Sequence, residues 1–192
     1  MSDVKRALRS ELIAVRARIA LDERRTGSLA IAERVDQVPA LREARIVSLY
    51  APLGTEVDSS EIARRVLARG ARLVYPRTVN GERRLAFARA EPGALVRGPL
   101  GALEPPPGAA EVALEEIDCV LMPGVAFSED GLRLGRGGGY YDATLKKMPR
   151  AARVGIGFEA QVVATLPREP HDVPLDAIVT EARVLLFPRE SR

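Results

Sequence analysis

The sequence has almost no cysteine and lacks long hydrophobic runs. Cysteine occurs once in 192 residues, at Cys119, which excludes an internal disulfide and suits a cytoplasmic protein. No run of about 18 apolar residues occurs, so we expect no membrane span and no membrane partner. Acidic residues such as Asp3 and Glu11 interrupt the arginine-rich N-terminus, which argues against a transit peptide.

A large excess of one charge is also missing. The 29 Lys and Arg residues nearly balance 26 Asp and Glu residues, giving a net charge of +3. Such a weakly basic surface fits an anionic small ligand as well as it fits nucleic acid. What is present is a hydrophobic fraction of 46%, enough for one sizeable core. We therefore expect a single domain over residues 1–192, acting as a monomer.

Short apolar runs alternate with amphipathic stretches, which predicts an α/β protein with a mostly parallel sheet. The expected strands cover 46–52, 72–76, part of 80–92 (LAFARA), 118–123, 153–158 and, as a final group, 176–187. Helices are expected over 28–37 and 59–69, the latter with a capping-box start at Asp58 and Glu61, and near Gly139 and Ala160. Residues 92–116, rich in proline and glycine, should form a long ordered loop without regular elements.

The N-terminal segment, residues 3–24, has the pattern of an amphipathic helix. Val4, Leu8, Leu12, Val15 and Ile19 recur at helical spacing and form one apolar stripe. Three cations, Lys5, Arg9 and Arg16, fall along one edge of that stripe. We expect their stems to lie on the packed edge while their charged ends stay in water.

The stretch RLGRGGGYYD, residues 133–142, follows a predicted strand and precedes a predicted helix. Ligands of open α/β sheets bind beyond the carboxyl ends of the strands, so a site is expected here. Glycines let backbone N–H groups approach an oxyanion, and Arg133 and Arg136 can donate to phosphate. Asp142 would repel a phosphate unless a divalent cation such as Mg²⁺ lay between them. The grouping therefore favours a metal–nucleotide site.

Other interpretations of this stretch remain open. A glycine-rich strand-to-helix turn can be purely structural, with Asp142 complementing a helix dipole. GRGGGYY also resembles RNA-binding RGG segments, although those are usually repeated. An enzyme acting on a phosphosugar or on coenzyme A could use a similar loop. The G-K-[ST] of a Walker loop is missing, which excludes a P-loop NTPase.

The longer segment LMPGVAFSEDGLRLGRGGGYYDATL closely resembles the signature of the 5-formyltetrahydrofolate cyclo-ligases. The K-x-x-x-R of Lys5 and Arg9, the segments SLYAPLGTEVD and GPLGALEP, and the tail HDVPLDAIVTE follow in that family's order. The resemblance implies a Rossmann-like three-layer α/β/α sandwich with a mostly parallel sheet and an N-terminal helical segment. It also implies an enzyme that closes the ring of 5-formyltetrahydrofolate with ATP and Mg²⁺, through a phosphorylated formyl group. The products are 5,10-methenyltetrahydrofolate, ADP and phosphate. A non-catalytic nucleotide- or RNA-binding module is the alternative, and no nucleic-acid partner is expected.

The resemblance also implies roles for individual residues. Asp142 and Asp176 are the expected Mg²⁺ ligands. Arg136 and Tyr140 are the expected catalytic residues. The expected ATP contacts are Lys5, Arg9, Arg133, Leu134, Gly135, Arg136, Gly137, Gly138, Gly139, Tyr140 and Tyr141. The expected folate contacts are Tyr50, Glu56, Arg136, Gly137, Gly138, Gly139 and Tyr140.

Two folate contacts have a clear chemical reason. The 2-amino-pyrimidinone edge of a pterin presents adjacent N–H donors, which match the two oxygens of Glu56. Tyr50 and Tyr140 could pack on the flat ring. Gly138 stands where many relatives carry lysine, so one cationic contact is absent.

Two reactive side chains are expected to lie outside the chemistry. The only histidine, His171, lies in a proline-punctuated turn, and we expect a structural or solvent-facing role for it. Cys119 should be an inert core thiol.

Overall fold

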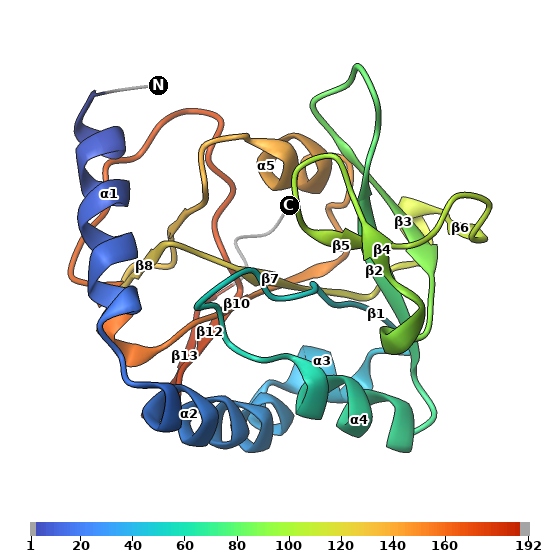
Figure 1. The fold of residues 1–192 in the computed structure, drawn as a ribbon, viewed down its shortest axis with the longest axis horizontal. Helices are drawn as coiled ribbons and strands as arrows, with labels where there is room; N and C mark the ends of the chain where they lie inside the picture. The colour runs from blue at the N-terminus through green and yellow to red at the C-terminus, as the bar shows by residue number, and fades with distance from the viewer. Residues whose placement is uncertain (1–2, 189–192) are drawn as a thin grey trace.

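The computed structural model describes residues 3–188 and is built around an eight-stranded sheet in the order β13-β12-β10-β7-β1-β2-β3-β6 (Figure 1). The five central strands from β12 to β2 run parallel, and β13, β3 and β6 add antiparallel edges. Their bounds are β1 Ile46–Ser48, β2 Arg72–Thr78, β3 Leu85–Arg89, β6 Glu111–Val112, β7 Cys119–Pro123, β10 Ala152–Ile156, β12 Ala177–Val179 and β13 Val184–Leu186.

Helices cover both faces of this sheet. On one face lie α2 (Leu21–Arg34), α3 (Pro39–Glu43) and α4 (Ser60–Ala68), and on the other lies α5 (Tyr140–Leu145) (Figure 1). Ile31, Leu41 and Ile62 bury the first face, whereas Leu145 and Met148 pack over the second. A parallel sheet needs this double cover because its strands are apolar on both sides. The predicted three-layer α/β/α architecture is confirmed.

The first helix stands at one side of the sheet rather than on a face. Helix α1 (Asp3–Ala17) packs through Leu12 against Val125 and Leu134, in a third apolar cluster. That cluster belongs to a small sheet of β8 (Ala126–Ser128), β9 (Arg133–Leu134) and β11 (Val162–Val163). A separate hairpin joins β4 (Val96–Arg97) to β5 (Leu103–Glu104). The expected N-terminal amphipathic helix is present, but it is shorter than predicted.

Three helix predictions need correction. The single helix expected over 3–24 breaks after Ala17, and α2 starts at Leu21, where the Glu23 carboxylate accepts the N–H of Ala20. The break lets α1 pack on the small sheet and α2 on the main one. Helix α2 therefore begins before the predicted 28–37, which ends in the 3-10 turn Val35–Gln37. Near Ala160 there is only the 3-10 turn Glu159–Gln161, because the chain continues into β11.

The strand predictions are right in place but differ in length. The strand expected over 46–52 ends at Ser48, and the strand expected over 72–76 continues to Thr78. The final strands expected within 176–187 are β12 and β13. The segment 92–116 is not free of regular structure: it holds β4, β5, β6 and the 3-10 turns Pro92–Ala94 and Leu114–Glu116. Strand β6 pairs with β3 through Val112 and Phe87, so this segment completes the edge of the main sheet.

Two aspartates fasten neighbouring parallel strands at their amino ends. Asp118, just before β7, accepts the N–H groups of Arg45 and Ile46 at 2.8 and 2.9 Å. Asp176, just before β12, accepts the N–H of Arg153 in β10 at 2.8 Å. Each carboxylate satisfies a strand-start donor that would otherwise lack a ladder partner. Both residues therefore mark the amino edge of the sheet.

The strand order reverses between β1 and β7. From β1 the chain proceeds to β2 and β3 on one side, and later from β7 to β10 and β12 on the other. The loops that leave the carboxyl ends of β1 and β7 thus diverge and leave a crevice between them. In open α/β sheets this switch point is where ligands bind.

Among residues 3–188, none of the helices combines the length and apolar character that a membrane crossing requires.

The core around β10 has no spare room, which makes Gly155 a test of the packing. A Cβ at Gly155 would lie 2.5 Å from Phe127 Cε1 and 2.8 Å from Leu175 Cδ1. We predict that Gly155→Ala lowers the free energy of unfolding by about 1–3 kcal/mol through overpacking, measured by urea denaturation. Gly93→Ala is the matched control, since no heavy atom lies within 4 Å of its Cβ position. Equal stability of the two variants would contradict the packing described.

Candidate active site

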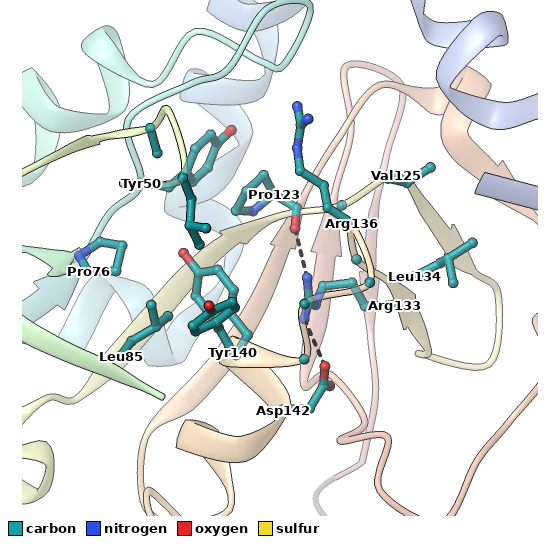
Figure 2. Close-up of a pocket in the computed structure, with 18 of the residues that line it drawn as sticks. Tyr50, Pro76, Leu85, Pro123, Val125, Arg133, Leu134, Arg136, Tyr140 and Asp142 are labelled. Carbon is teal, nitrogen blue, oxygen red and sulfur yellow. Dashed lines mark hydrogen bonds and ion pairs between the residues drawn. The ribbon is translucent and has the colours of Figure 1, made fainter. Parts of the chain in front are cut away.

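A cavity of about 510 Å³ occupies the crevice at the switch point. This volume is in the range of small-molecule sites. Its wall is formed by loops after β1 and β7, the glycine loop 135–139, α1, the β2–β3 hairpin, the β4–β5 hairpin and residues 169–172. Figure 2 shows part of this wall, with Tyr50 and Tyr140 on one side and Arg133 and Asp142 on the other. All predicted site residues but one line the cavity: Lys5, Arg9, Tyr50, Glu56, Arg133, Leu134, Gly135, Arg136, Gly137, Gly138, Gly139, Tyr140, Tyr141 and Asp142.

The glycine loop has a shape that side chains would prevent. Gly137 and Gly139 have φ angles of 101° and 68°, in the left-handed region that favours glycine. Gly138 differs from these two, because its Cβ would lie 2.7 Å from the Tyr140 ring and could be accommodated only if that ring shifted. The loop therefore holds its backbone bare against the cavity. The helix that follows, α5, has only six residues. The backbone N–H groups of the loop are therefore better suited to contact an anion than the dipole of this short helix.

Arg133 is the fixed cation of the site. Its side chain is 6% exposed, its Nη1 donates to the Pro123 carbonyl at 3.2 Å, and its Nη2 lies 3.5 Å from Asp142 Oδ2 (Figure 2). The guanidinium also sits 5.1 Å from the centre of the Tyr141 ring, a cation–π distance. Arg133 thereby joins the end of β7 to the first turn of α5.

Two tyrosines of the cavity wall are held in the neutral form. Burial, together with the nearby Glu56 carboxylate, raises the pKa of Tyr50 well above its usual value. Burial also raises the pKa of Tyr141, with the Arg133 guanidinium acting in the opposite direction. Tyr50 is 2% exposed and donates its hydroxyl to the Val57 carbonyl at 3.1 Å. Both rings therefore offer flat, uncharged surface to a ligand.

Glu56 lies deep in the cavity and is already occupied. Its side chain is 5% exposed, and Oε2 accepts the N–H of Leu53 at 2.9 Å. Oε1 accepts two hydrogen bonds from Arg136, from Nε at 3.2 Å and from Nη2 at 3.0 Å. Arg136 itself is 52% exposed. One oxygen of the carboxylate is thus held by the backbone, and the other is covered by a half-exposed arginine.

Lys5 is buried, contrary to the expectation that its charge stays in water. Its Nζ lies 2.6 Å from Asp172 Oδ2 and 3.1 Å from Glu169 Oε2, with the lysine side chain 5% exposed. The Lys5 ammonium lowers the pKa of Glu169, chiefly by its hydrogen bond.

His171, for which we expected a structural or solvent-facing role, has a side chain that is 59% exposed. It lines the cavity, and its Nε2 lies 3.2 Å from Glu169 Oε2.

Arg9 and Arg16, the other two cations along the edge of the apolar stripe, also turn inward. Arg9 Nε donates to the Gly135 carbonyl at 2.8 Å. Its Nη1 is buried without a hydrogen-bond partner among residues 3–188. Arg16 is 3% exposed, whereas we expected it at the wet edge of the helix. An unsatisfied buried donor beside a cavity points to an acceptor supplied by a ligand.

Asp176 is the predicted site residue that does not line the cavity. Its carboxylate lies at the amino edge of the sheet, where it accepts the N–H of Arg153, while the cavity opens at the carboxyl ends. Four residues earlier, Asp172 does line the cavity. The two aspartates flank a short proline turn, and sequence pattern alone gave no means to choose the one that faces the ligand. Its position gives the expected pairing of Asp176 with Asp142 no support.

Sequence reasoning missed several residues of the cavity wall. Arg83, from the β2–β3 hairpin, donates from Nε to the Gly138 carbonyl. Its Nη2 lies 2.9 Å from the position that a Cβ of Gly139 would occupy. Glu104, 6% exposed, accepts the N–H and hydroxyl of Thr78 at 3.0 and 2.6 Å and fixes the β4–β5 hairpin. Arg83 comes from a segment without a motif, and Glu104 lies in the segment GPLGALEP, in which no local pattern marked this residue.

The cavity offers oxygen ligands to a hard cation. Asp142, with its side chain 20% exposed, lies beside the glycine loop. On another wall, Glu169, His171 and Asp172 place one ligand atom each within 4.8 Å of one another. Carboxylate oxygens are what Mg²⁺ prefers, so Asp142 and Asp172 fit such an ion chemically.

The fold and the cavity together define an open, doubly wound α/β protein whose cavity, lined by a glycine loop and arginines, lies at the switch point. The sequence profile of the 5-formyltetrahydrofolate cyclo-ligase family matches residues 1–181, and the chain belongs to this family.

Individual relatives agree with this assignment. The 5-formyltetrahydrofolate cyclo-ligase of Mycolicibacterium smegmatis is 34% identical over 152 residues, 76% of this chain and 78% of the relative. The solution structure of Aquifex aeolicus 5,10-methenyltetrahydrofolate synthetase superposes with a TM-score of 0.83 at 33% identity, covering 98% of this chain and 95% of that one. The synthetase of Mycoplasma pneumoniae gives 0.76 at 26% identity, covering 94% and 99%. The protein is accordingly an enzyme, which sets aside the non-catalytic module.

Proposed function

We propose that the protein uses ATP to close the ring of 5-formyltetrahydrofolate, producing 5,10-methenyltetrahydrofolate, ADP and phosphate. The observation that carries the proposal is the pairing, in one cavity, of a bare glycine loop lined by arginines with a buried carboxylate. The first suits a phosphate chain and the second suits the N–H edge of a pterin. Family membership supplies the reaction class.

The chemistry needs activation of a poor leaving group. The formyl oxygen on N5 attacks the γ-phosphorus of ATP, the bond to the bridging oxygen of ADP breaks, and an iminium phosphate forms. N10 then attacks the formyl carbon, its proton is released, and the C–O bond breaks to free phosphate. The carbon ends bonded to both N5 and N10. Positioning and charge neutralisation are the protein's main tasks in such transfers.

The glycine loop and its cations are assigned to the nucleotide. Backbone N–H groups of Gly137 to Gly139 and the Arg136 guanidinium would stabilise charge on the transferring phosphoryl group. The unsatisfied Nη1 of Arg9 is a further donor for a phosphate oxygen. Tyr140, beside the loop, is assigned to the space between phosphate and folate.

A bound Mg²⁺ would offset the charge of the phosphates. We propose Asp142 and Asp172 as the residues that hold it, in place of the pair Asp142 and Asp176, because only the former two line the cavity. In the free protein the Lys5 ammonium is paired with the carboxylates of Asp172 and Glu169. A metal ion that took its place would release Lys5 to bind the phosphates.

Folate binding requires an exchange at Glu56. Arg136 holds Oε1 in the free protein, and a pterin can use that oxygen only when Arg136 leaves. The released guanidinium is then available to phosphate. Binding of one substrate should therefore favour binding of the other, and the coupling must be reciprocal.

The proposed reaction has a direct test. Mixing the protein with Mg-ATP and 5-formyltetrahydrofolate should generate the near-ultraviolet absorbance of the methenyl product together with ADP. Omission of ATP is the control and should give no product. Purified protein that leaves 5-formyltetrahydrofolate unchanged in the presence of Mg-ATP is incompatible with the proposal.

The metal assignment separates three aspartates. We predict that Asp142→Asn and Asp172→Asn lower turnover by a factor of about ten or more and raise the Mg²⁺ concentration for half-maximal rate, since each removes a charged ligand. Asp176→Asn should leave that concentration unchanged and lower thermal stability, because it weakens the bond to the Arg153 N–H. A raised Mg²⁺ requirement in Asp142→Asn and Asp176→Asn, with that of Asp172→Asn unchanged, would restore the original pair.

The exchange at Glu56 can be measured without turnover. We predict that saturating 5-formyltetrahydrofolate raises the affinity for a non-hydrolysable ATP analogue by about fivefold or more, a typical coupling, in calorimetric titrations. Arg136→Ala should bind the analogue equally with and without folate. The control Arg84→Ala, which removes an exposed hairpin cation paired with Glu82, should keep the coupling. Full coupling in Arg136→Ala would show that this arginine does not link the substrates.

A further inference from the structure

A buried arginine stands behind the carboxylate that Arg136 covers. Arg16, near the end of α1, has a side chain that is 3% exposed. Its Nε donates to Thr55 Oγ1 at 3.0 Å, its Nη1 donates to the Gly124 carbonyl at 3.1 Å, and the same Nη1 lies 3.9 Å from Glu56 Oε1. One guanidinium thus contacts both loops that flank the switch point.

These contacts place Arg16 differently from Arg136. Arg136 is half-exposed and bonds Glu56 from the cavity side, whereas Arg16 reaches it from the protein interior. A bound pterin can displace Arg136, but it cannot displace a cation held by Thr55 and by a backbone carbonyl. When Arg136 leaves, Arg16 is the cation that remains beside Glu56. Removing that cation as well would leave a deeply buried carboxylate without a charged partner, which is costly.

The geometry does not resemble an ion pair optimised for stability. The shortest contact between Arg16 and Glu56 is 3.9 Å, longer than a hydrogen bond, and the direct donors go to Thr55 and Gly124 instead. Burial lowers the pKa of Arg16, an effect that Glu56 opposes and Arg136 reinforces. The cost of burying this cation is better explained by what it does for its neighbours in the site.

We propose that Arg16 is a positioning residue for the folate substrate: it fixes the loop of Thr55 and Glu56 and keeps the Glu56 carboxylate oriented toward the pterin N–H donors. Arg16 acts through Glu56 and does not touch the substrate. The inference rests on the proposed function, since it assigns to Glu56 the recognition of 5-formyltetrahydrofolate.

A double-mutant cycle tests this role. Arg16→Met should raise the KM for 5-formyltetrahydrofolate by about tenfold or more, the effect of one charge-assisted interaction, with the KM for ATP changed by less than about twofold. In the Glu56→Gln background, Arg16→Met should add less than about twofold, because both residues act on one interaction. Arg18→Met, at an exposed position two residues further on, is the matched control and should behave like the wild type.

Arg16→Lys covers the case in which Arg16→Met does not fold. Lysine keeps the charge and loses the planar fork, so its KM for folate should lie between those of the wild type and Glu56→Gln. Equal factors for Arg16→Met, or for Arg16→Lys, with and without Glu56→Gln would overturn the proposal, as would a parallel rise in the KM for ATP. Either result indicates a general structural role.

The wild type separates this inference from the function beneath it. If the wild type forms the methenyl product and the cycle is additive, only the role of Arg16 fails. If the wild type neither turns over nor binds 5-formyltetrahydrofolate in a calorimetric titration, the proposed function fails and the role of Arg16 fails with it.

Discussion

The reversal of strand order between β1 and β7 is the constraint on which the site depends. Because β1 leads to β2 on one side and β7 leads to β10 on the other, the two loops leaving their carboxyl ends cannot pack on each other. Glu56 belongs to one of these loops and Gly124 to the other, while the glycine loop follows β9 above them. Distant parts of the chain thus meet in one crevice without a dedicated binding domain. The two aspartates at the opposite edge, Asp118 and Asp176, keep the strands in register beneath it.

Charge in the cavity is balanced before any ligand arrives. Lys5 is held by Glu169 and Asp172, Arg133 by Asp142, and Arg136 by Glu56. At these three sites an anionic ligand must therefore exchange partners, and the net gain is the difference between two sets of contacts. Arg9 differs, because its Nη1 has no hydrogen-bond partner among residues 3–188. This arrangement favours ligands that replace both members of a pair at once. A nucleotide that takes the cation, together with a metal or a pterin that takes the carboxylate, satisfies every group, whereas either alone leaves a buried charge uncompensated.

The architecture could be predicted because apolar runs such as 118–123 report burial on both faces, and the glycine loop could be predicted because its residues are consecutive. Two of its glycines have positive φ, and a Cβ on a third would lie close to the Tyr140 ring. The run of glycines in the sequence therefore predicts the bare backbone of the loop directly. Arg83, Glu104 and Asp172 could not be predicted, since each reaches the cavity from a segment whose position is set by tertiary pairing. The position of Asp176 outside the cavity could not be predicted for the same reason: two aspartates four residues apart look alike in sequence, and only the direction of β12 distinguishes their surroundings. The inward turn of Lys5 and Arg16 was missed because periodicity gives the face of a helix and not what lies opposite its edge.

Helix α1 shows how closely folding and binding are joined in this molecule. Its apolar contact with the rest of the chain is small, with Leu12 buried and Leu8 and Val15 partly buried. Its polar contacts include three cations, each directed to a different part of the cavity wall: Lys5 to Asp172, Arg9 to Gly135 and Arg16 to Gly124. Residues assigned to the site therefore also dock the helix. A ligand that binds Lys5 or Arg9 contacts α1 itself and therefore binds best when this helix is docked. Binding in the cavity and the docking of α1 should thus stabilise each other. Arg16 differs in that its partners belong to the protein alone, which lets it keep the helix in place while the other two cations change partners.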